Sequence, residues 1–370
     1  MIKFSKSNIS QKTLIDVKNV LKNGWLTHGK FSQNFENEFK KYTKSKYCTI
    51  VSSCTAALHI SCLALGFKKG DEVIVTAMSH TATSHAVEYT GAKVIFADIN
   101  FSTGNIDPEN IKKLINKKTK ALIIVHMAGK SCEMKKIVEI CNKKKIKIIE
   151  DCAHALGTKF EKKHVGNFGI SGCFSFYPTK QLTTGEGGAL ITNSSSFYRK
   201  VKMLKAFGID KDITERKNPG EYDVKYLGFN YRMTDFQAAM GYNQLKNYNK
   251  NLKRRLEIAK RYIKRLKDMN KIFIPEFSKN DSYFVFQIFL NTKKMKFDLM
   301  KKFKEKNIGI SVHYGTPLPS MTYYKKKYNY KLHQYKNSLD YAQKVISLPV
   351  YPKLKNNEID LICKYIKESI

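Results

Sequence analysis

The chain has 370 residues, and its 67 Lys and Arg against 31 Asp and Glu give a formal net charge of +36 at pH 7. Hydrophobic residues make up 42% of the chain and charged residues 26%, which is ordinary for a globular protein and excludes wholesale disorder. No run of about 18 apolar residues is present, and the N-terminus lacks an apolar stretch before a small-residue cleavage site. We therefore expect a cytoplasmic globular protein without a membrane-spanning helix.

From about residue 47, short apolar runs alternate with amphipathic stretches. The apolar runs are rich in Val and Ile and alternate little, which is typical of strands covered on both faces. Strand-helix repetition predicts a mostly parallel sheet with right-handed crossovers. We expect strands at residues 48–53, 71–77, 93–99, 120–126 and 146–151, separated by helices at 55–66, 80–91, 107–118 and 133–145.

The pattern changes after residue 151. Two more strands are expected at 172–177 and 187–193, then a helix at 196–208, a charged loop to 228, and a helical stretch over 233–269 that reads as one helix or two. Beyond residue 270, isolated strands at 283–290 and 308–314 mix with helices at 296–306, 335–345 and 356–369. We predict a large α/β domain with an N-terminal arm over 1–245 and a small α+β domain over 246–370.

The basic residues and the cysteines both favour simple interpretations. Only seven of the 67 basic residues are Arg, and Lys is scattered through every segment, so we expect solvated faces that attract anionic ligands rather than a nucleic-acid site. The cysteines include no C-x-x-C pair, and we expect free, buried thiols. We predict no metal site, because the nine His show no ligand spacing on a helix. The cysteines are Cys48, Cys54, Cys62, Cys132, Cys141, Cys152, Cys173 and Cys363.

Three stretches near predicted strand ends carry candidate chemistry. Lys180 lies between two predicted strands, where a partly desolvated amine becomes a nucleophile for a carbonyl. Asp151 and His154 follow the strand at 146–151, and an acid there, about thirty residues before a candidate Schiff-base Lys, suggests pyridoxal phosphate (PLP). Residues 52–57 form a strand-to-helix junction that suits an anion. The alternatives are a helix N-cap at Asp151 and ordinary capping within 52–57.

Longer motifs resemble one family from end to end. They are GWLTHGKFSQNFENEF (24–39), EDCAHALGTKF (150–160), VGNFGISGCFSFYPTKQLTTGEGGAL (165–190) and LGFNYRMTDFQAAMG (227–241). With them the chain resembles the DegT/DnrJ/EryC1/StrS family of PLP-dependent sugar aminotransferases. The resemblance implies the fold type I architecture of aspartate aminotransferase: an α/β fold with a mostly parallel sheet flanked by helices, plus a small α+β C-terminal domain.

The resemblance also implies roles around the cofactor. Lys180 matches the lysine that forms the Schiff base and moves the proton, and Asp151 matches the acid that pairs with the pyridine nitrogen. His154 matches a position beside the cofactor 3-hydroxyl. His80 matches the ring, more often Phe, that stacks on the pyridine.

Further matches concern the phosphate and the substrate. Cys54, where the family usually has Gly, and Thr55 match the turn that binds the phosphate, and Ser175 matches a hydroxyl on it. Asn230 matches a residue that reaches the phosphate from the other subunit, which implies a homodimer with shared active sites. The segments that contact sugar or nucleotide in similar enzymes contain Trp25, Thr27, His28, His313 and Tyr314.

Position 180 also separates subfamilies. Relatives that remove a 3-hydroxyl carry His there, so Lys180 favours transamination over dehydration. The expected reaction moves an amino group from L-glutamate to a nucleotide-linked keto-sugar, with a 4-keto-6-deoxyhexose preferred, for amino-sugar and surface-glycan biosynthesis. A 3-keto-sugar or a keto-cyclitol is the alternative acceptor. An inactive PLP-binding protein and a basic nucleic-acid-binding protein are the alternatives outside enzymes.

Overall fold

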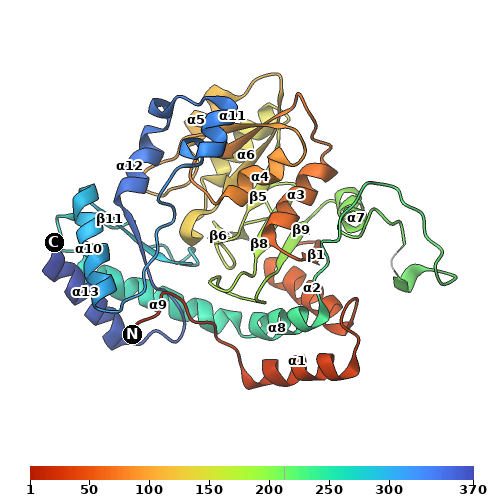
Figure 1. The fold of residues 1–370 in the computed structure, drawn as a ribbon, viewed down its shortest axis with the longest axis horizontal. Helices are drawn as coiled ribbons and strands as arrows, with labels where there is room; N and C mark the ends of the chain where they lie inside the picture. The colour runs from red at the N-terminus through yellow and green to blue at the C-terminus, as the bar shows by residue number, and fades with distance from the viewer. Residues whose placement is uncertain (212) are drawn as a thin grey trace.

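The centre of the fold is a seven-stranded sheet, seen in a computed structural model that describes residues 1–211 and 213–370 (Figure 1). One strand, β9, is antiparallel to both of its neighbours, and the other adjacent pairs run parallel, which confirms the predicted α/β class. In spatial order the strands are β1 (Tyr47–Val51), β9 (Gly188–Thr192), β8 (Ser171–Ser175), β5 (Lys147–Asp151), β4 (Thr119–Val125), β2 (Glu72–Thr76) and β3 (Lys93–Ala97).

Helices cover both faces of this sheet. Alternate residues of a strand point to opposite faces, so apolar side chains of one strand pack against helices on both sides. Val73 and Val75 pack in one core cluster with Leu58, whereas Ile74 packs in another with Ile137. The first face carries α3 (Cys54–Ala64), α4 (Thr81–Glu88) and α7 (Ser195–Leu204). The second carries α2 (Lys30–Thr43), α5 (Pro108–Leu114), α6 (Met134–Lys143) and α8 (Asp235–Lys246).

A second, smaller sheet lies toward the C-terminus. Its strands β10 (Ile272–Phe273), β11 (Phe286–Leu290) and β12 (Val345–Leu348) are antiparallel and share a core cluster with Ile2 and the helices around them. These helices are α9 (Tyr248–Leu266), α10 (Lys293–Glu305) and α13 (Asn356–Ser369), with α12 (Lys336–Lys344) alongside. The domain boundary expected after residue 245 falls at the α8–α9 junction, and the division into two domains stays a prediction.

The helical stretch expected at 233–269, as one helix or two, is two helices separated at Asn247. Other expected elements differ from the structure. The strand expected at 308–314 is wrong: Ile308 forms a single bridge with Ile2, and Ser311 forms one with Ser347, so no continuous ladder exists there. Helices and strands without a sequence expectation are α1 (Gln11–Asn23), α2, α11 (Thr322–Tyr328), β10, β12 and the small hairpin β6 (Lys159–Phe160) and β7 (Lys163–His164).

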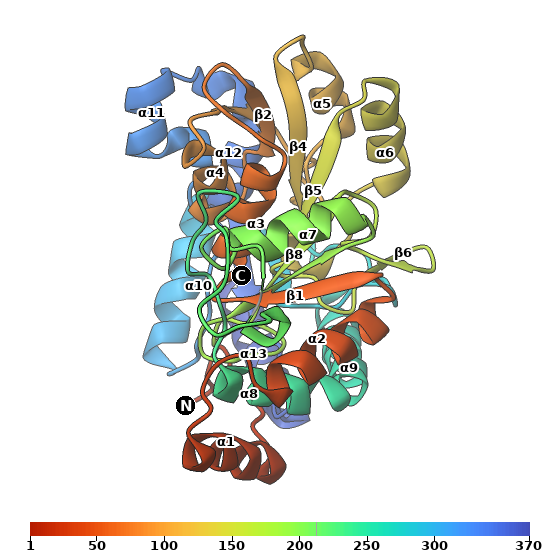
Figure 2. The ribbon, with the colours of Figure 1, turned by 90° about the vertical axis from the view of Figure 1, so that its right-hand side faces the viewer.

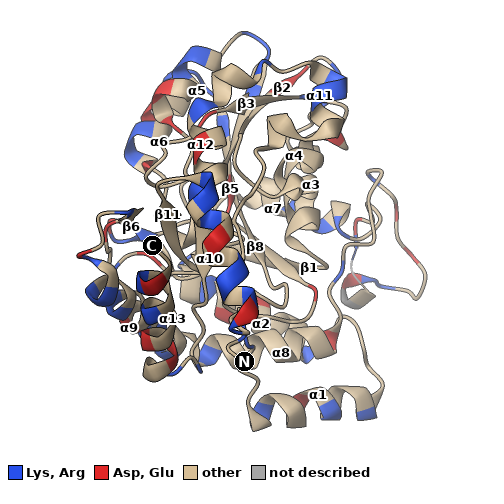
Figure 3. Cartoon of the chain, turned by 60° about the vertical axis from the view of Figure 1, so that its left-hand side comes forward, with Lys and Arg blue, Asp and Glu red and all other residues tan. Residues whose placement is uncertain are grey.

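The charged residues are spread over the molecule, and the cysteines lie in its interior. Figure 3 shows Lys and Arg spread over helices at both ends of the molecule and interspersed with Asp and Glu. All eight cysteines are buried and free, which confirms the expectation for the thiols. Within residues 1–211 and 213–370, no helix has both the length and the apolar character that crossing a membrane requires.

Candidate active site

Asp151 ends β5 and points to the sheet face that carries α3 and α4. Its carboxylate accepts hydrogen bonds from the Thr83 hydroxyl at 2.8 Å and from the Ala153 N–H at 3.0 Å. Burial raises the pKa of Asp151, and these hydrogen bonds together with the Lys180 charge act in the opposite direction. The result is a buried carboxylate fixed in orientation and ready to pair with a cationic ring nitrogen.

Lys180 lies in the loop between β8 and β9, on the same side of the sheet. Burial lowers the pKa of Lys180 to about 8, although the charge of Asp151 favours its protonated form. Its Nζ lies 4.5 Å from the centre of the Phe284 ring. A lysine with this pKa has a sizeable fraction of neutral amine near physiological pH, which suits attack on a carbonyl carbon.

His154 occupies a buried position between these groups and the small sheet. Its ring stacks on Phe284 at 4.4 Å with an interplanar angle of 15°, and its Nε2 lies 3.2 Å from the Tyr314 hydroxyl. Burial, followed by the Lys180 charge, holds the pKa of His154 well below its usual value, so the ring is neutral. Its Nδ1 is buried and has no hydrogen-bond partner within the described residues, which leaves a polar atom for a ligand.

The N-terminus of α3 forms a candidate anion site. Ser53 is the N-cap and accepts a hydrogen bond from the Ala56 N–H at 3.0 Å, so the capping alternative describes Ser53 correctly. Cys54 and Thr55 follow in the first turn, where backbone N–H groups have no acceptor within the helix. A Cβ atom on Gly188 would lie 2.6 Å from the Cys54 nitrogen, so glycine is needed for β9 to pass this turn.

Other predicted residues surround this centre. Ser175 ends β8, and its hydroxyl accepts a weak hydrogen bond from the Tyr177 N–H at 3.4 Å. His80 caps α4 through its Nδ1, and its exposed ring lies 6.3 Å from that of Tyr314. The His313 ring lies 5.7 Å from the His154 ring, and its Nδ1 lies 3.0 Å from the Ser347 hydroxyl.

The remaining predicted residues form a separate, exposed group. Trp25, Thr27 and His28 lie in the α1–α2 connection, which is held to α8 by a 2.7 Å hydrogen bond from the Asp235 N–H to the Leu26 carbonyl. Arg232 connects this segment to the one that contains Asn230. Its guanidinium lies 3.4 Å from His28 Nε2 and donates to the Asn230 side chain at 3.0 Å. The predicted residues thus fall into a buried centre around Lys180 and an exposed group around Arg232.

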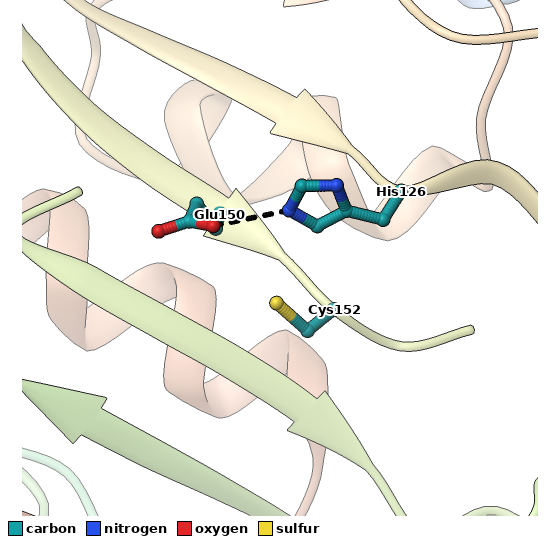
Figure 4. Close-up of side chains that lie close together, drawn as sticks. All are labelled: His126, Glu150 and Cys152. Carbon is teal, nitrogen blue, oxygen red and sulfur yellow. Dashed lines mark hydrogen bonds and ion pairs between the residues drawn. The ribbon is translucent and has the colours of Figure 1, made fainter. Parts of the chain in front are cut away.

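A buried carboxylate on the opposite face supports the end of β5. Figure 4 shows Glu150, His126 and Cys152 close together, with Glu150 Oε2 3.1 Å from His126 Nε2. Glu150 also accepts hydrogen bonds of 2.7 Å from three backbone N–H groups, those of residues 166, 168 and 169. His126 Nδ1 accepts from the Cys132 N–H at 3.1 Å, so protein hydrogen bonds engage both ring nitrogens of His126 and both carboxylate oxygens of Glu150.

Two residues of the centre were not predicted from the sequence. Thr83 orients Asp151, and the position of TATSH after a strand end was the signal that could have found it. Phe284 contacts both Lys180 and His154, yet it lies more than 100 residues from either in the sequence, within an ordinary apolar strand pattern. No local motif distinguishes Phe284 from its apolar neighbours.

Comparison with known proteins shows the family of the chain. The model of the DegT/DnrJ/EryC1/StrS aminotransferase family matches residues 7–367. The chain belongs to this family. It is 34% identical over 354 residues to GDP-perosamine synthase of Escherichia coli O157:H7, covering 95% of this chain and 94% of the relative. It is 33% identical over 377 residues to the spore coat polysaccharide biosynthesis protein SpsC of Bacillus subtilis, covering 99% of this chain and 96% of that protein.

Solved structures of this family superpose closely. Helicobacter pylori PseC, an aminotransferase of pseudaminic acid biosynthesis, is 29% identical with a TM-score of 0.94 over 100% of this chain and 98% of that chain. A sugar aminotransferase from Streptococcus pneumoniae in its pyridoxamine phosphate (PMP) form is 27% identical with a TM-score of 0.94 over 100% of this chain and 99% of that one. The protein is therefore a PLP-dependent aminotransferase of a sugar aminotransferase family.

The chain's own residues fit PLP at the centre around Lys180. The buried, unpartnered His154 Nδ1 offers a hydrogen bond to a ligand. The first turn of α3 offers N–H groups to a phosphate, and Asp151 offers a buried carboxylate to a cationic ring nitrogen. The lowered pKa of Lys180 completes the set that PLP chemistry requires.

Proposed function

We propose that this aminotransferase moves an amino group from L-glutamate to a nucleotide-diphosphate keto-sugar, with a 4-keto-6-deoxyhexose as the preferred acceptor, in a cytoplasmic homodimer. The observation that carries the proposal is the convergence of Lys180, Asp151 and His154 at the carboxyl edge of the sheet. The acceptor class rests on the relatives, since E. coli O157:H7 and Vibrio cholerae proteins at 34% and 33% identity are GDP-perosamine synthases.

The residues of the centre divide the work of such a transfer. PLP, when bound, supplies an electron sink for the carbon that loses a proton. Asp151 holds the positive charge of the ring nitrogen, and the Thr83 hydroxyl keeps that carboxylate oriented. The Lys180 amine binds the cofactor and moves the proton during the transfer, for which its pKa of about 8 is well matched.

In this proposal the acceptor binds at the entrance of the centre around Lys180. His313 and Tyr314 lie beside His154 and face the same space, so they contact the sugar in our proposal. The strongly positive net charge of +36 draws a nucleotide diphosphate toward the protein.

The exposed group around Arg232 belongs to the partner's active site in this proposal. Apolar side chains on α1 and its connection are unusually exposed, and α1 lies outside α8, apart from the main body (Figure 2). Burial of such a patch against a second copy would bring Trp25, Thr27, His28 and Asn230 to the other subunit's centre. The exposed apolar residues on α1 and its connection are Leu14, Ile15, Leu21, Trp25 and Leu26, and those in the loop before Asn230 are Tyr222, Val224, Tyr226 and Leu227.

A half-reaction tests the reaction and the acceptor together. The purified protein is converted with L-glutamate to its PMP form, and UDP-, dTDP- and GDP-linked 4-keto-6-deoxy sugars are then added separately. Return of the visible PLP absorption band with one of these sugars identifies the acceptor and its nucleotide. The Lys180→Ala variant serves as the control, because removal of this amine is expected to slow the transfer by roughly 10²–10⁴-fold.

Each other outcome of this experiment has a defined meaning. If glutamate converts the cofactor but none of the three sugars restores the band, the acceptor assignment is wrong, and 3-keto-sugars and keto-cyclitols are tested next. If glutamate leaves the band unchanged while another amino acid bleaches it, the donor assignment is wrong. If wild type and Lys180→Ala behave alike, the role of Lys180 is wrong.

Subunit mixing tests the shared site. Lys180→Ala and Asn230→Asp each inactivate their homodimer in this proposal, the second by placing a carboxylate beside the phosphate. In mixed dimers one site regains both residues, so random exchange restores about a quarter of wild-type activity. Restored activity supports the exchange of Asn230 between subunits, and two variants that stay inactive after verified exchange contradict it.

A further inference from the structure

A segment of the small sheet reaches into the centre around Lys180. The Phe284 ring, 2% exposed, lies just before β11 and presents its face to the Lys180 Nζ at 4.5 Å. The same ring stacks on His154 at 4.4 Å. A cation held within about 6 Å of an aromatic ring centre is attracted by the ring's negative face. Phe284 is therefore the apolar side chain that contacts both the amine and its neighbouring imidazole.

The backbone of this segment is clamped to the large sheet. The Ser282 N–H donates to the Gly129 carbonyl at 2.9 Å, and the Phe284 N–H donates to the Ala128 carbonyl at 3.0 Å. Gly129 has a φ of 91°, and a Cβ atom there would lie 2.8 Å from the Tyr283 nitrogen, so only glycine permits this approach. The clamp follows β4 and so ties the small sheet to the edge where Asp151 lies.

A side-chain network joins the segment to the loop of Lys180. Gln181, the next residue after Lys180, donates from Nε2 to the Ser282 hydroxyl at 2.9 Å and to the His154 carbonyl at 2.7 Å. Thr158 donates to the same Ser282 hydroxyl at 2.8 Å. The position of Phe284 relative to Lys180 is thus fixed by directional bonds on both sides of the contact.

Arg255 of α9 holds the segment from the other side. Its guanidinium, 2% exposed, donates from Nη1 to the carbonyls of Tyr283 at 3.1 Å, Phe284 at 3.3 Å and Val350 at 2.7 Å. No carboxylate pairs with Arg255 among the residues that the structure describes. A buried charge is costly unless hydrogen bonds satisfy it, so its use on three backbone carbonyls indicates a specific positioning role.

We propose that Phe284 is a catalytic residue whose ring holds the free ammonium group of Lys180, and that Arg255 is its positioning residue. The proposal rests on the proposed function of Lys180 as the cofactor lysine. That lysine is free for part of each catalytic cycle, in surroundings that disfavour its charge. An aromatic face stabilises the ammonium without a strong hydrogen bond, so the amine is not trapped there and returns readily to the reaction.

The groups that face Lys180 set the reference for a test. The Asp151 carboxylate favours the charged form of Lys180. The charge of Lys180 in turn lowers the pKa of the neighbouring His80, His154 and His313 rings. Substitution of Phe284 changes none of these titratable groups. Phe284 also packs against His154 and His313, so the shift in the titration of Lys180 is compared with that of a matched control variant.

The test measures covalent capture of PLP by the cofactor-free protein. The rate at which the visible absorption band forms after mixing depends on the fraction of neutral Lys180 amine, so its pH profile gives a midpoint for that amine. Phe284→Leu removes the ring and keeps apolar volume, and we expect the midpoint to fall by about 0.5 pH unit. Arg255→Met should lower it as well, and Arg255→Lys should restore part of the difference.

A matched control separates the ring contact from general damage. Phe286→Leu removes an equally buried ring, 3% exposed, two residues along the same segment, where it stacks on Tyr262 instead of facing Lys180. Its midpoint should equal that of wild type. A lower midpoint confined to Phe284→Leu and the Arg255 variants supports the proposal. Equal midpoints in Phe284→Leu and wild type, or equal shifts in Phe284→Leu and Phe286→Leu, overturn it.

Failure of the proposed function gives a different result from failure of the Phe284 proposal. In that case Lys180→Ala would form the same visible absorption band at the same rate as wild type. Folding is checked for every variant by its thermal midpoint. If Arg255→Met does not fold, the comparison of Phe284→Leu with Phe286→Leu still decides the role of the ring, and Arg255→Lys decides the role of the guanidinium.

Discussion

Glu150 and His126 form a buried carboxylate–imidazole pair directly behind Asp151, with 3.1 Å between Oε2 and Nε2. The Cys132 N–H donates to His126 Nδ1, so a ring proton of His126 lies on Nε2 and points at the carboxylate. Because neighbouring residues of a strand face opposite ways, Glu150 anchors the end of β5 from one face while Asp151 bonds Thr83 on the other. The strand end that positions Asp151 is thereby held on both sides.

Replacement of Glu150 by Gln should destabilise the protein by about 3 kcal/mol, because a side-chain N–H would then meet backbone N–H donors that now bind the carboxylate. The free energy of unfolding from urea titration measures this change. Glu139→Gln is the matched control, since Glu139 lies on the surface of α6 with 60% of its side chain exposed and should change stability by less than about 0.5 kcal/mol. Similar values for both variants would contradict the anchoring role.

Loss of the Thr83 hydroxyl should lower kcat while leaving the fold intact. Thr83→Val keeps the side-chain volume but removes the 2.8 Å hydrogen bond to Asp151, and a hydrogen bond to a charged group is worth about 1.5 kcal/mol, or roughly tenfold in rate. Steady-state kinetics with the identified acceptor provide the measurement. Thr83→Ser restores the hydroxyl and should recover most of the rate, and an unchanged kcat in Thr83→Val would show that Asp151 is oriented without it.

The stability of the protein should decrease in mild acid because His164 must gain a second proton. Its Nε2 accepts from the Gly157 N–H at 2.9 Å and its Nδ1 bonds the Val165 carbonyl, so a second proton has no acceptor, and burial lowers its pKa to about 4. The unfolded chain, with a His pKa near 6.5, therefore binds more protons between these pH values. The free energy of unfolding should fall by about 3 kcal/mol as the pH falls from 6.5 to 4.

Denaturant titrations at several pH values check this contribution. His164→Gln removes the titrating group, so the variant should lose less stability than wild type between pH 6.5 and 4. Parallel pH profiles for the two proteins would assign the acid sensitivity to other groups.

The eight thiols should react only when the protein unfolds. All are buried, and burial raises the pKa of Cys54 and Cys173 in particular, which disfavours the reactive thiolate. With an aromatic disulfide reagent at pH 8, the folded protein should release little thiolate, and addition of guanidinium should release close to eight equivalents. Rapid reaction of one thiol in the folded protein would identify a local opening near it.

The sequence predicted the parallel core and the local motifs but not the contacts between distant segments. Val73 and Ile74 belong to a continuous apolar run, and such runs identify strands buried on both faces. Lys180 and Asp151 stood out because each follows or precedes a strand within a characteristic motif. The prediction of a strand at 308–314 was wrong. The pattern is apolar enough for a strand, but the residues that bridge to it, Ile2 and Ser347, come from opposite ends of the chain.

The amino-acid sequence by itself determined the fold class and, through its motifs, the family and the cofactor, because these depend on local patterns. It also predicted residues around the cofactor, Lys180 and Asp151 among them. Only the tertiary structure decided which distant side chains complete the centre. Thr83 on Asp151, Phe284 against Lys180, and Arg255 behind Phe284 join segments that lie far apart in the chain. Such contacts arise from the packing of helices and of the Phe284 segment around the large sheet, and no local pattern records which side chains that packing brings together.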